Sequence, residues 1–174
     1  SEMCIRDRIL DVRNNGGGNL TTAEKLAERF TNEKKLIGYM SYKTGPGHNE
    51  FSTPEAVYLE PPMDRVRWQK HTVVLTNRRS YSATNDFVNR MKQLDRVTVI
   101  GDKTGGGSGL PFSSELPNGW SVRFSASPMY DPDMKHLEFG IKPDKKVDIT
   151  SEDYNKGIDT IIEAAREYLH NHKQ

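Results

Sequence analysis

Residues 72–87 read TVVLTNRRSYSATNDF, and this stretch decides the fold. The apolar run Thr72–Thr76 predicts a short buried strand, and apolar residues at helical spacing from Phe87 to Leu94 predict a helix after it. Ser82 lies in the turn between them, where the first N–H groups of a helix point outward and stabilise developing negative charge. Ser82 is therefore a candidate nucleophile, although capping the helix is a role that serine fills often.

Size and composition limit the classes of protein. A chain of 174 residues suffices for one domain with a core, and its 25 Lys and Arg against 24 Asp and Glu give a net charge of +1. This balance predicts no nucleic-acid partner. Apolar runs of about five residues predict no membrane span, since a span needs roughly twenty. One cysteine, Cys4, excludes an internal disulfide and a cysteine metal site, and we expect neither metal nor cofactor.

The first eight residues look unlike the rest. SEMCIRDR, residues 1–8, shows neither a helical nor a strand period and joins abruptly to Ile9. We interpret residues 1–8 as a non-native leader. Residues 9–174 are then expected to form a single domain whose N-terminal part is missing.

A glycine-rich segment, NNGGGN at residues 14–19, follows a strand predicted over residues 8–13. After it, Thr21 and Glu24 have the spacing of a capping box, which predicts a helix with Thr21 as its N-cap. The glycines thus lie between a strand end and a helix start, where α/β folds bind ligands. The alternative is a tight turn that needs glycine for its shape alone.

Further patterns complete the α/β prediction. A strand at 97–100 leads into GDKTGGGSG, residues 101–109, which lacks the order of a phosphate-binding P-loop. Asn118-Gly119 predicts a hairpin turn. The long segment 44–70 is expected to be a lid or binding loop, or to contain short strands such as 57–59. A capping box at Thr150 opens a helical pattern that we expect to pack as one stripe on the core.

Four stretches stand in a definite order: LDVRNNGGG, NRRSYSATNDF, GDKTGGGSG and EFGIKPD. This combination resembles the catalytic core of the tail-specific (C-terminal processing) serine peptidases, and more closely their tricorn-core-like branch, over Ile9–Val147. The resemblance implies an α/β fold of the Clp protease/crotonase type, built from ββα units, with residues 9–174 as the catalytic core. It also implies a protein or peptide substrate and a location in the cell envelope or outside the cytosol.

The resemblance assigns roles to five residues. Ser82 matches the nucleophile in the S-x-S-A pattern, and Ala83 matches the residue whose amide lines the oxyanion hole. The D-x-R-x-N-x-G-G motif that begins at Asp11 supplies the other donor, for which we favour Gly17, with Gly18 close behind. Glu138 matches the acidic member of a catalytic tetrad, with one residue fewer between the acid and the next glycine than in the tricorn-like pattern.

The general base departs from the pattern. Processing peptidases place a lysine where this chain has Gly107, and Lys103 lies four residues too early. The tricorn-like branch uses a histidine upstream of the glycine motif, which would lie before residue 9. His136 is a local candidate that no family motif supports.

Three functional hypotheses follow. The first is a serine endopeptidase that forms an acyl-enzyme on Ser82. The second is a non-catalytic module that holds an extended peptide by strand addition, a reading favoured by the missing lysine. The third is a crotonase-like acyl-transfer enzyme, for which the S-x-S-A pattern is not expected.

Overall fold

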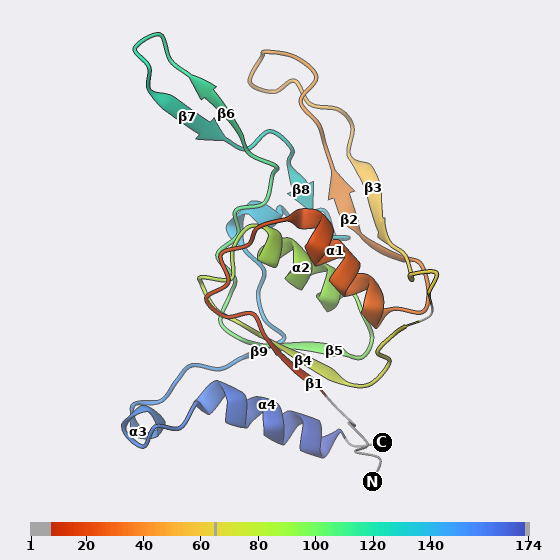
Figure 1. Ribbon diagram of the computed structural model, residues 1–174, viewed down its shortest axis with the longest axis vertical. Coiled ribbons are helices and arrows are strands. Elements are labelled where there is room, and N and C mark those ends of the chain that lie inside the picture. The colour runs from red at the N-terminus through yellow and green to blue at the C-terminus, as the bar shows by residue number, and fades with distance from the viewer. Residues whose placement is uncertain (1–7, 65, 173–174) are drawn as a thin grey trace.

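The centre of the molecule is a four-stranded parallel sheet with the order β1-β4-β5-β9 (Figure 1). The computed structural model describes residues 8–64 and 66–172. The sequence predicted three of these strands, and those three predictions are confirmed. Apart from Arg8, the leader predicted at residues 1–8 lies outside the described residues. The strands are β1 (Arg8–Asp11), β4 (Thr72–Thr76), β5 (Val97–Gly101) and β9 (Lys145–Lys146).

Helices cover both faces of this sheet. All five residues of β4 are buried, as expected for a parallel strand between two layers. Val74 packs in a core cluster with residues of α1 (Leu20–Ala27) and α2 (Ala83–Lys92). Val73 points to the other face, where it joins residues of α4 (Thr160–Asn171) in a second cluster. The alternation along β4 therefore fixes the three-layer α/β architecture.

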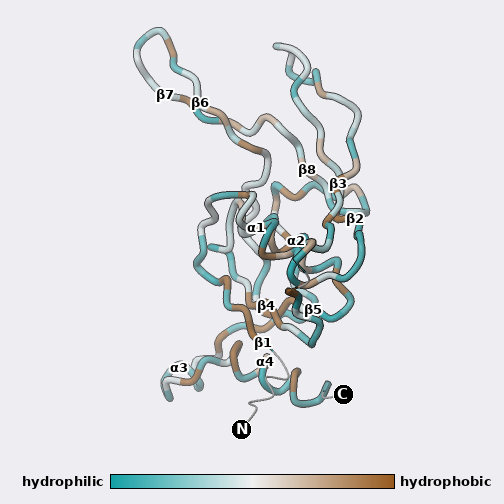
Figure 2. The backbone as a smooth tube through the Cα atoms, turned by 45° about the vertical axis from the view of Figure 1, so that its right-hand side comes forward, coloured by the Kyte–Doolittle hydropathy of each residue, from teal (hydrophilic) through white to brown (hydrophobic). Residues whose placement is uncertain are grey.

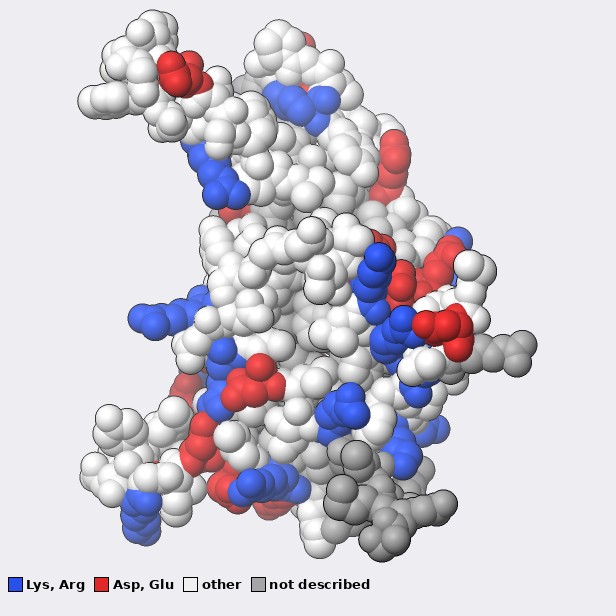
Figure 3. Space-filling view, viewed as in Figure 1, with Lys and Arg blue, Asp and Glu red and all other residues white. Residues whose placement is uncertain are grey.

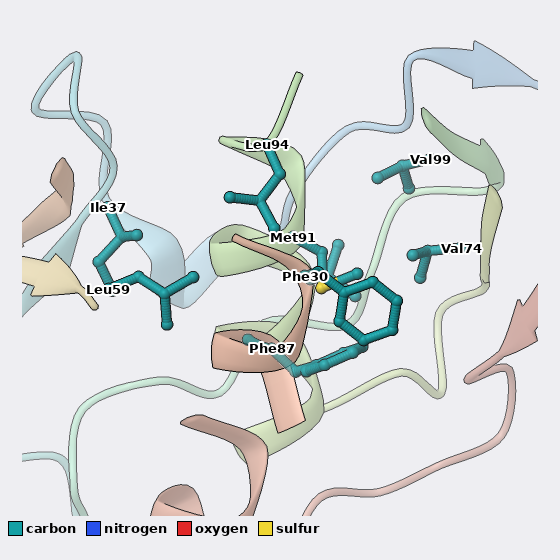
Figure 4. Close-up of a cluster of buried hydrophobic side chains, with 10 residues drawn as sticks. Phe30, Ile37, Leu59, Val74, Phe87, Met91, Leu94 and Val99 are labelled. Carbon is teal, nitrogen blue, oxygen red and sulfur yellow. The ribbon is translucent and has the colours of Figure 1, made fainter. Parts of the chain in front are cut away.

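The larger cluster fixes α2 on the sheet. Figure 4 shows Phe30, Phe87 and Met91 lying together, with Val74 and Val99 of the sheet beside them. Phe30 ends the short helix η1 (Glu28–Phe30), which extends α1. The hydrophobic parts of the backbone tube gather where β1, β4 and α4 lie (Figure 2). Because this apolar packing holds α2 against β4, it also fixes the turn that joins them.

Two antiparallel hairpins project from the same side of the body (Figure 1). The first pairs two strands of a sheet with the order β3-β2-β8. The second carries Gly119, at φ +85°, in its turn, which confirms the hairpin that Asn118-Gly119 predicts. On the face seen in Figure 3, charges of both signs intermingle over the body, whereas the hairpin region is mainly uncharged. Their strands are β2 (Lys35–Met40), β3 (Glu55–Leu59), β8 (Met129–Tyr130), β6 (Phe112–Glu115) and β7 (Ser121–Phe124).

The start of α1 differs from the prediction. The N-cap is Asn19, whose side-chain oxygen accepts a hydrogen bond from the Thr22 amide at 3.1 Å. The prediction of Thr21 as N-cap was wrong. Both residues are good caps, and the helix extends back to Leu20 because Asn19 already has the extended backbone that a cap needs.

The C-terminal helical pattern divides into two helices. Thr150 caps α3 (Ser151–Asn155) as predicted, but Gly157 at φ +70° follows, and Asp159 caps a new helix, α4. Tyr154 is 75% exposed, so it does not belong to the core stripe that we expected. The single-helix prediction was wrong because a left-handed glycine breaks the helical repeat.

Candidate active site

Ser82 occupies a strained position at the start of α2. Its backbone angles, φ 59° and ψ −125°, are uncommon for a residue with a side chain. Its amide donates to Gly106 O at 2.8 Å. Its side chain makes no capping hydrogen bond within the described part of the chain, so the capping interpretation of Ser82 fails. Strain of this kind tends to be kept at functional sites.

The turn before Ser82 is fixed from several sides. The Ser80 hydroxyl donates to Val12 O at 2.8 Å and accepts from the Asn77 amide at 3.1 Å. The Tyr81 amide donates to Asn15 O at 3.0 Å. These bonds tie the turn to the end of β1, and the polar groups involved find partners although Ser80 is fully buried.

The first glycine loop, residues 16–18, lies directly against Ser82. A Cβ atom placed on Gly17 would be 2.8 Å from Ser82 Cβ and 2.8 Å from the Ala83 nitrogen. Only glycine allows this approach, and Gly17 also has φ +97°. The Gly17 amide donates to Asn15 Oδ1 at 3.0 Å. The Ala83 amide is in the first turn of α2, where the helix itself supplies no acceptor.

A cavity of about 630 Å³ brings the predicted residues together. Its lining includes the first glycine loop, Ser82 and Glu138, with Arg123 and Phe124 contributed by β7. Glu138 belongs to the short helix η2 (Leu137–Phe139), and its Oε2 is buried without a hydrogen-bond partner in the described structure. The nucleophile candidate and the acid candidate thus share one space.

The two local candidates for a base lie elsewhere. Lys103 and His136 line another cavity, of about 440 Å³, which does not include Ser82. His136 Nδ1 accepts a hydrogen bond from the Glu138 amide at 3.1 Å, but His136 is not among the residues that line the Ser82 cavity. The cavity beside Ser82 is therefore lined by Glu138 but by neither Lys103 nor His136.

At position 107, where the resemblance expects a lysine, a side chain would meet the Tyr81 ring. Gly107 has φ +77°, and a Cβ atom on it would lie 2.1 Å from Cζ of Tyr81. The Tyr81 ring covers this loop, so a lysine at position 107 would have to displace it. This contact gives a physical reason for the glycine.

Sequence reasoning missed Asp86, which is 2% exposed and lies one turn after Ser82. Its Oδ2 accepts from Arg90 Nε at 2.6 Å, while Oδ1 is buried without a partner in the described structure. Burial raises the pKa of Asp86, and the neighbouring Arg90 opposes that rise. The signal in the sequence was an i,i+4 acid–base pair within an apolar pattern, which usually indicates a solvated helix face.

The described residues form neither a metal-binding cluster nor a membrane-spanning helix. No cluster of His, Cys, Asp or Glu among residues 8–64 and 66–172 has the geometry to hold a metal ion. Over the same residues, every helix is too short or too polar to cross a membrane.

Comparisons with known proteins show the family of this chain. The family model of Peptidase family S41 matches residues 3–147. The chain belongs to this family, and the resemblance to the tail-specific serine peptidases is confirmed. Over 145 residues it is 28% identical to a probable CtpA-like serine protease of Staphylococcus saprophyticus, covering 83% of this chain and 28% of the relative. The chain thus spans about 28% of that relative's length.

Two solved structures show the same fold. A peptidase candidate from Parabacteroides merdae ATCC 43184 has a TM-score of 0.90 and 61% identity, over 94% of this chain and 52% of that one. Mature CPAF has a TM-score of 0.81 at 16% identity, over 97% of this chain and 45% of that one. The predicted α/β fold of this peptidase class is confirmed.

Proposed function

We propose that this chain is the nucleophile-bearing part of a serine endopeptidase. The observation behind the proposal is Ser82, which is held in a strained turn against Gly17 and faces a cavity shared with Glu138. A helix capped by its side chain would not need that conformation. Membership in a family of serine peptidases supports the same reading.

The reaction follows from these positions. The Ser82 hydroxyl oxygen attacks the carbonyl carbon of a peptide bond while its proton passes to a base. The resulting oxyanion accepts hydrogen bonds from the Ala83 amide and the Gly17 amide. The Gly17 amide gives up its hydrogen bond to Asn15 Oδ1 in order to donate to the oxyanion. The Gly18 amide is the alternative donor. Each such donor contributes about 3–4 kcal/mol at the transition state. The base returns the proton to the leaving amine, the C–N bond breaks, and water then hydrolyses the acyl-enzyme.

We propose an imidazole from upstream of residue 9 as the base, with Glu138 orienting it. A neutral imidazole suits this role near pH 7. Glu138 lines the Ser82 cavity, and its Oε2 is buried without a hydrogen-bond partner among residues 8–64 and 66–172; this supports the orienting role, because a buried carboxylate oxygen requires a donor. The placement of Lys103 and His136 along another cavity argues against both local candidates.

The substrate and location follow from the family. We propose protein or peptide substrates, and a cell-envelope or extracellular site of action. The CtpA-like relative supports this class of substrate. The near-neutral charge of the chain supports the prediction of no nucleic-acid partner.

A non-catalytic peptide-binding module is the second candidate. The separation of Lys103 and His136 from Ser82 favours it. Such a module would keep the cavity but would have no need of a reactive serine.

Labelling with a fluorophosphonate probe separates the two candidates. We would label this chain and a form extended upstream, each with a Ser82→Ala control. Labelling of the extended form alone, lost in the alanine variant, is the expected result. Equal labelling of this chain would show a base among its own residues. A well-folded extended form that stays unlabelled would overturn the peptidase proposal and favour the binding module.

A further inference from the structure

Glu138 lies on an element that is too short to hold it in place alone. The helix η2 has three residues, and helices of this kind have poor hydrogen-bond geometry, so their position depends on contacts outside them. The Leu137 side chain is buried in a small apolar cluster, but Phe139 is 74% exposed. Further contacts are therefore needed to fix the Glu138 carboxylate relative to Ser82.

Backbone hydrogen bonds connect Ser82 to Glu138 through the second glycine loop. The Ser82 amide donates to Gly106 O at 2.8 Å, and the Gly107 amide donates to Glu138 O at 3.1 Å. Glycine has access to many backbone conformations, so these two glycines do not hold the loop in shape by themselves. The position of the acid relative to the nucleophile thus depends on what holds this loop.

The side chain of Asn85 joins α2, this loop and η2. Asn85 is fully buried on α2, three residues after Ser82. Its Nδ2 donates to Leu137 O at 3.1 Å and to Ser108 Oγ at 2.8 Å. Its Oδ1 accepts from the Thr104 hydroxyl at 2.6 Å. One amide thus links the start of α2 to both ends of the glycine loop and to the residue before Glu138.

The partners of this amide determine its orientation. The Leu137 carbonyl can only accept, so the Nδ2 end of Asn85 must face it. Oδ1 then faces Thr104, whose Oγ1 accepts from the Ile141 amide at 2.7 Å and gives its own proton to Asn85. Asn85 and Thr104 are both buried, and a buried network whose members all have partners is rigid. The network can therefore transmit the position of α2 to η2.

We propose that Asn85 is a positioning residue for catalysis, which holds η2 so that the Glu138 carboxylate stays aligned with Ser82. The inference rests on the proposed function, in which Glu138 orients the base. Asn85 lines neither of the two cavities that Ser82 lines, so it acts through its bond to Leu137 O and not on the substrate.

A double-mutant cycle tests this role. We would measure the rate of fluorophosphonate labelling of Ser82 in the form extended upstream, for Asn85→Ala, Glu138→Gln and the double variant. We expect Asn85→Ala to slow labelling by about 10- to 100-fold and Glu138→Gln by about 100-fold. The double variant should label within about threefold of Glu138→Gln, because Asn85 acts through Glu138. Slowing by the product of the two single effects would overturn the proposal.

Asn89 provides a matched control on the same helix. It is also buried, but its Nδ2 donates to Ile37 O, in β2, at 2.8 Å. We expect Asn89→Ala to lower stability in urea as Asn85→Ala does, yet to label within about threefold of the parent protein. Equal slowing of labelling by the two variants would show a general effect of destabilisation and would overturn the proposal.

A second variant covers the case in which Asn85→Ala does not fold. Thr104→Val keeps the shape of the side chain but removes the donor to Asn85, and we expect it to slow labelling by about 5- to 20-fold in the same cycle. A folded extended form without any labelling rejects the peptidase proposal itself. Unchanged labelling of Glu138→Gln rejects the role of Glu138 and this inference with it. Labelling of Asn85→Ala within about threefold of the parent rejects this inference alone.

Discussion

The two glycine loops beside Ser82 use their glycines differently. In the first, residues 16–18, a Cβ on Gly17 would meet close neighbours, whereas one on Gly16 or Gly18 would meet no atom of the described residues within 4 Å. In the second, residues 105–107, every glycine packs closely, and its amides and carbonyls bond to the protein itself. The first loop is thus packed at one glycine only, whereas the second is packed at all three, although Gly107 also lines the cavity beside Ser82. Equal glycine content does not mean equal function.

The second loop should be the more fragile. Gly106 has φ +83°, and a Cβ on it would lie 1.9 Å from Glu138 O. We expect Gly106→Ala to lower the free energy of unfolding by about 2–5 kcal/mol, since it combines an unfavourable φ with overpacking against backbone. Urea denaturation measures this.

A matched control is available in the β6–β7 hairpin. Gly119 has nearly the same φ, +85°, but a Cβ there would meet no atom within 4 Å in the part of the chain that the structure describes. Gly119→Ala should therefore lower the free energy of unfolding only by the cost of a positive φ for alanine, about 1 kcal/mol. Similar losses in the two variants would show that close packing does not distinguish the second loop.

The first loop should matter more for reactivity. Gly17→Ala places a Cβ against Ser82 and the Ala83 amide, so we expect fluorophosphonate labelling of the extended form to slow by about 100-fold or more. Gly16→Ala is the stability control, with an expected change within about 0.5 kcal/mol. A labelling rate for Gly17→Ala within threefold of the parent would contradict an oxyanion role for this loop.

A smaller effect concerns the anchor of the first loop. Arg13, just before that loop, pairs with Asp159, the N-cap of α4, at 2.8 Å. The hydrogen bond from Arg13 lowers the pKa of Asp159 below its usual 3.8, and the Ile161 and Ile162 amides add to this. The folded state favours the ionised Asp159 carboxylate. The stabilisation that this carboxylate gives is therefore present above about pH 3.8 and is lost as the pH falls through its lowered pKa.

Asp159→Asn should remove this pH dependence. The amide still caps α4, so we expect a loss of about 0.5–1 kcal/mol at pH 7, after allowing for solvent screening. The difference in the free energy of unfolding between the variant and the parent protein should disappear below pH 3.8. Thermal unfolding across pH gives the measurement, and Asp148→Asn, in an exposed pair with Lys146, serves as control with no expected change. A gap that stays constant down to acid pH would contradict the assignment.

Short sequence patterns predicted the elements that depend mainly on interactions between residues close in the chain. Apolar runs such as Thr72–Thr76, the Asn118-Gly119 turn and the order of the motifs were enough for three of the four strands of the sheet, one hairpin and the family. The errors arose where two good signals competed, as with Asn19 and Thr21 for one cap. They also arose where a single glycine, Gly157, broke a longer pattern.

The site was predictable only in part. Ser82, Gly17 and Glu138 are named by motifs, and the structure brings them to one cavity. Asp86 escaped because α2 is buried on nearly all sides, so polar residues lie inside although the apolar period marks only one face. His136 and Glu138 are two residues apart in the chain but line different cavities, and chain order does not encode which of them meets Ser82.

The backbone of Ser82 also has an evolutionary consequence. A residue with a side chain at φ 59° and ψ −125° is costly to keep, and glycine would relieve that cost. Selection for stability alone would therefore favour glycine at this position, and only selection for chemistry would retain serine. A lineage that lost the activity would be expected to drift toward glycine here while its core stayed unchanged, so this one position would record whether its members still need a nucleophile.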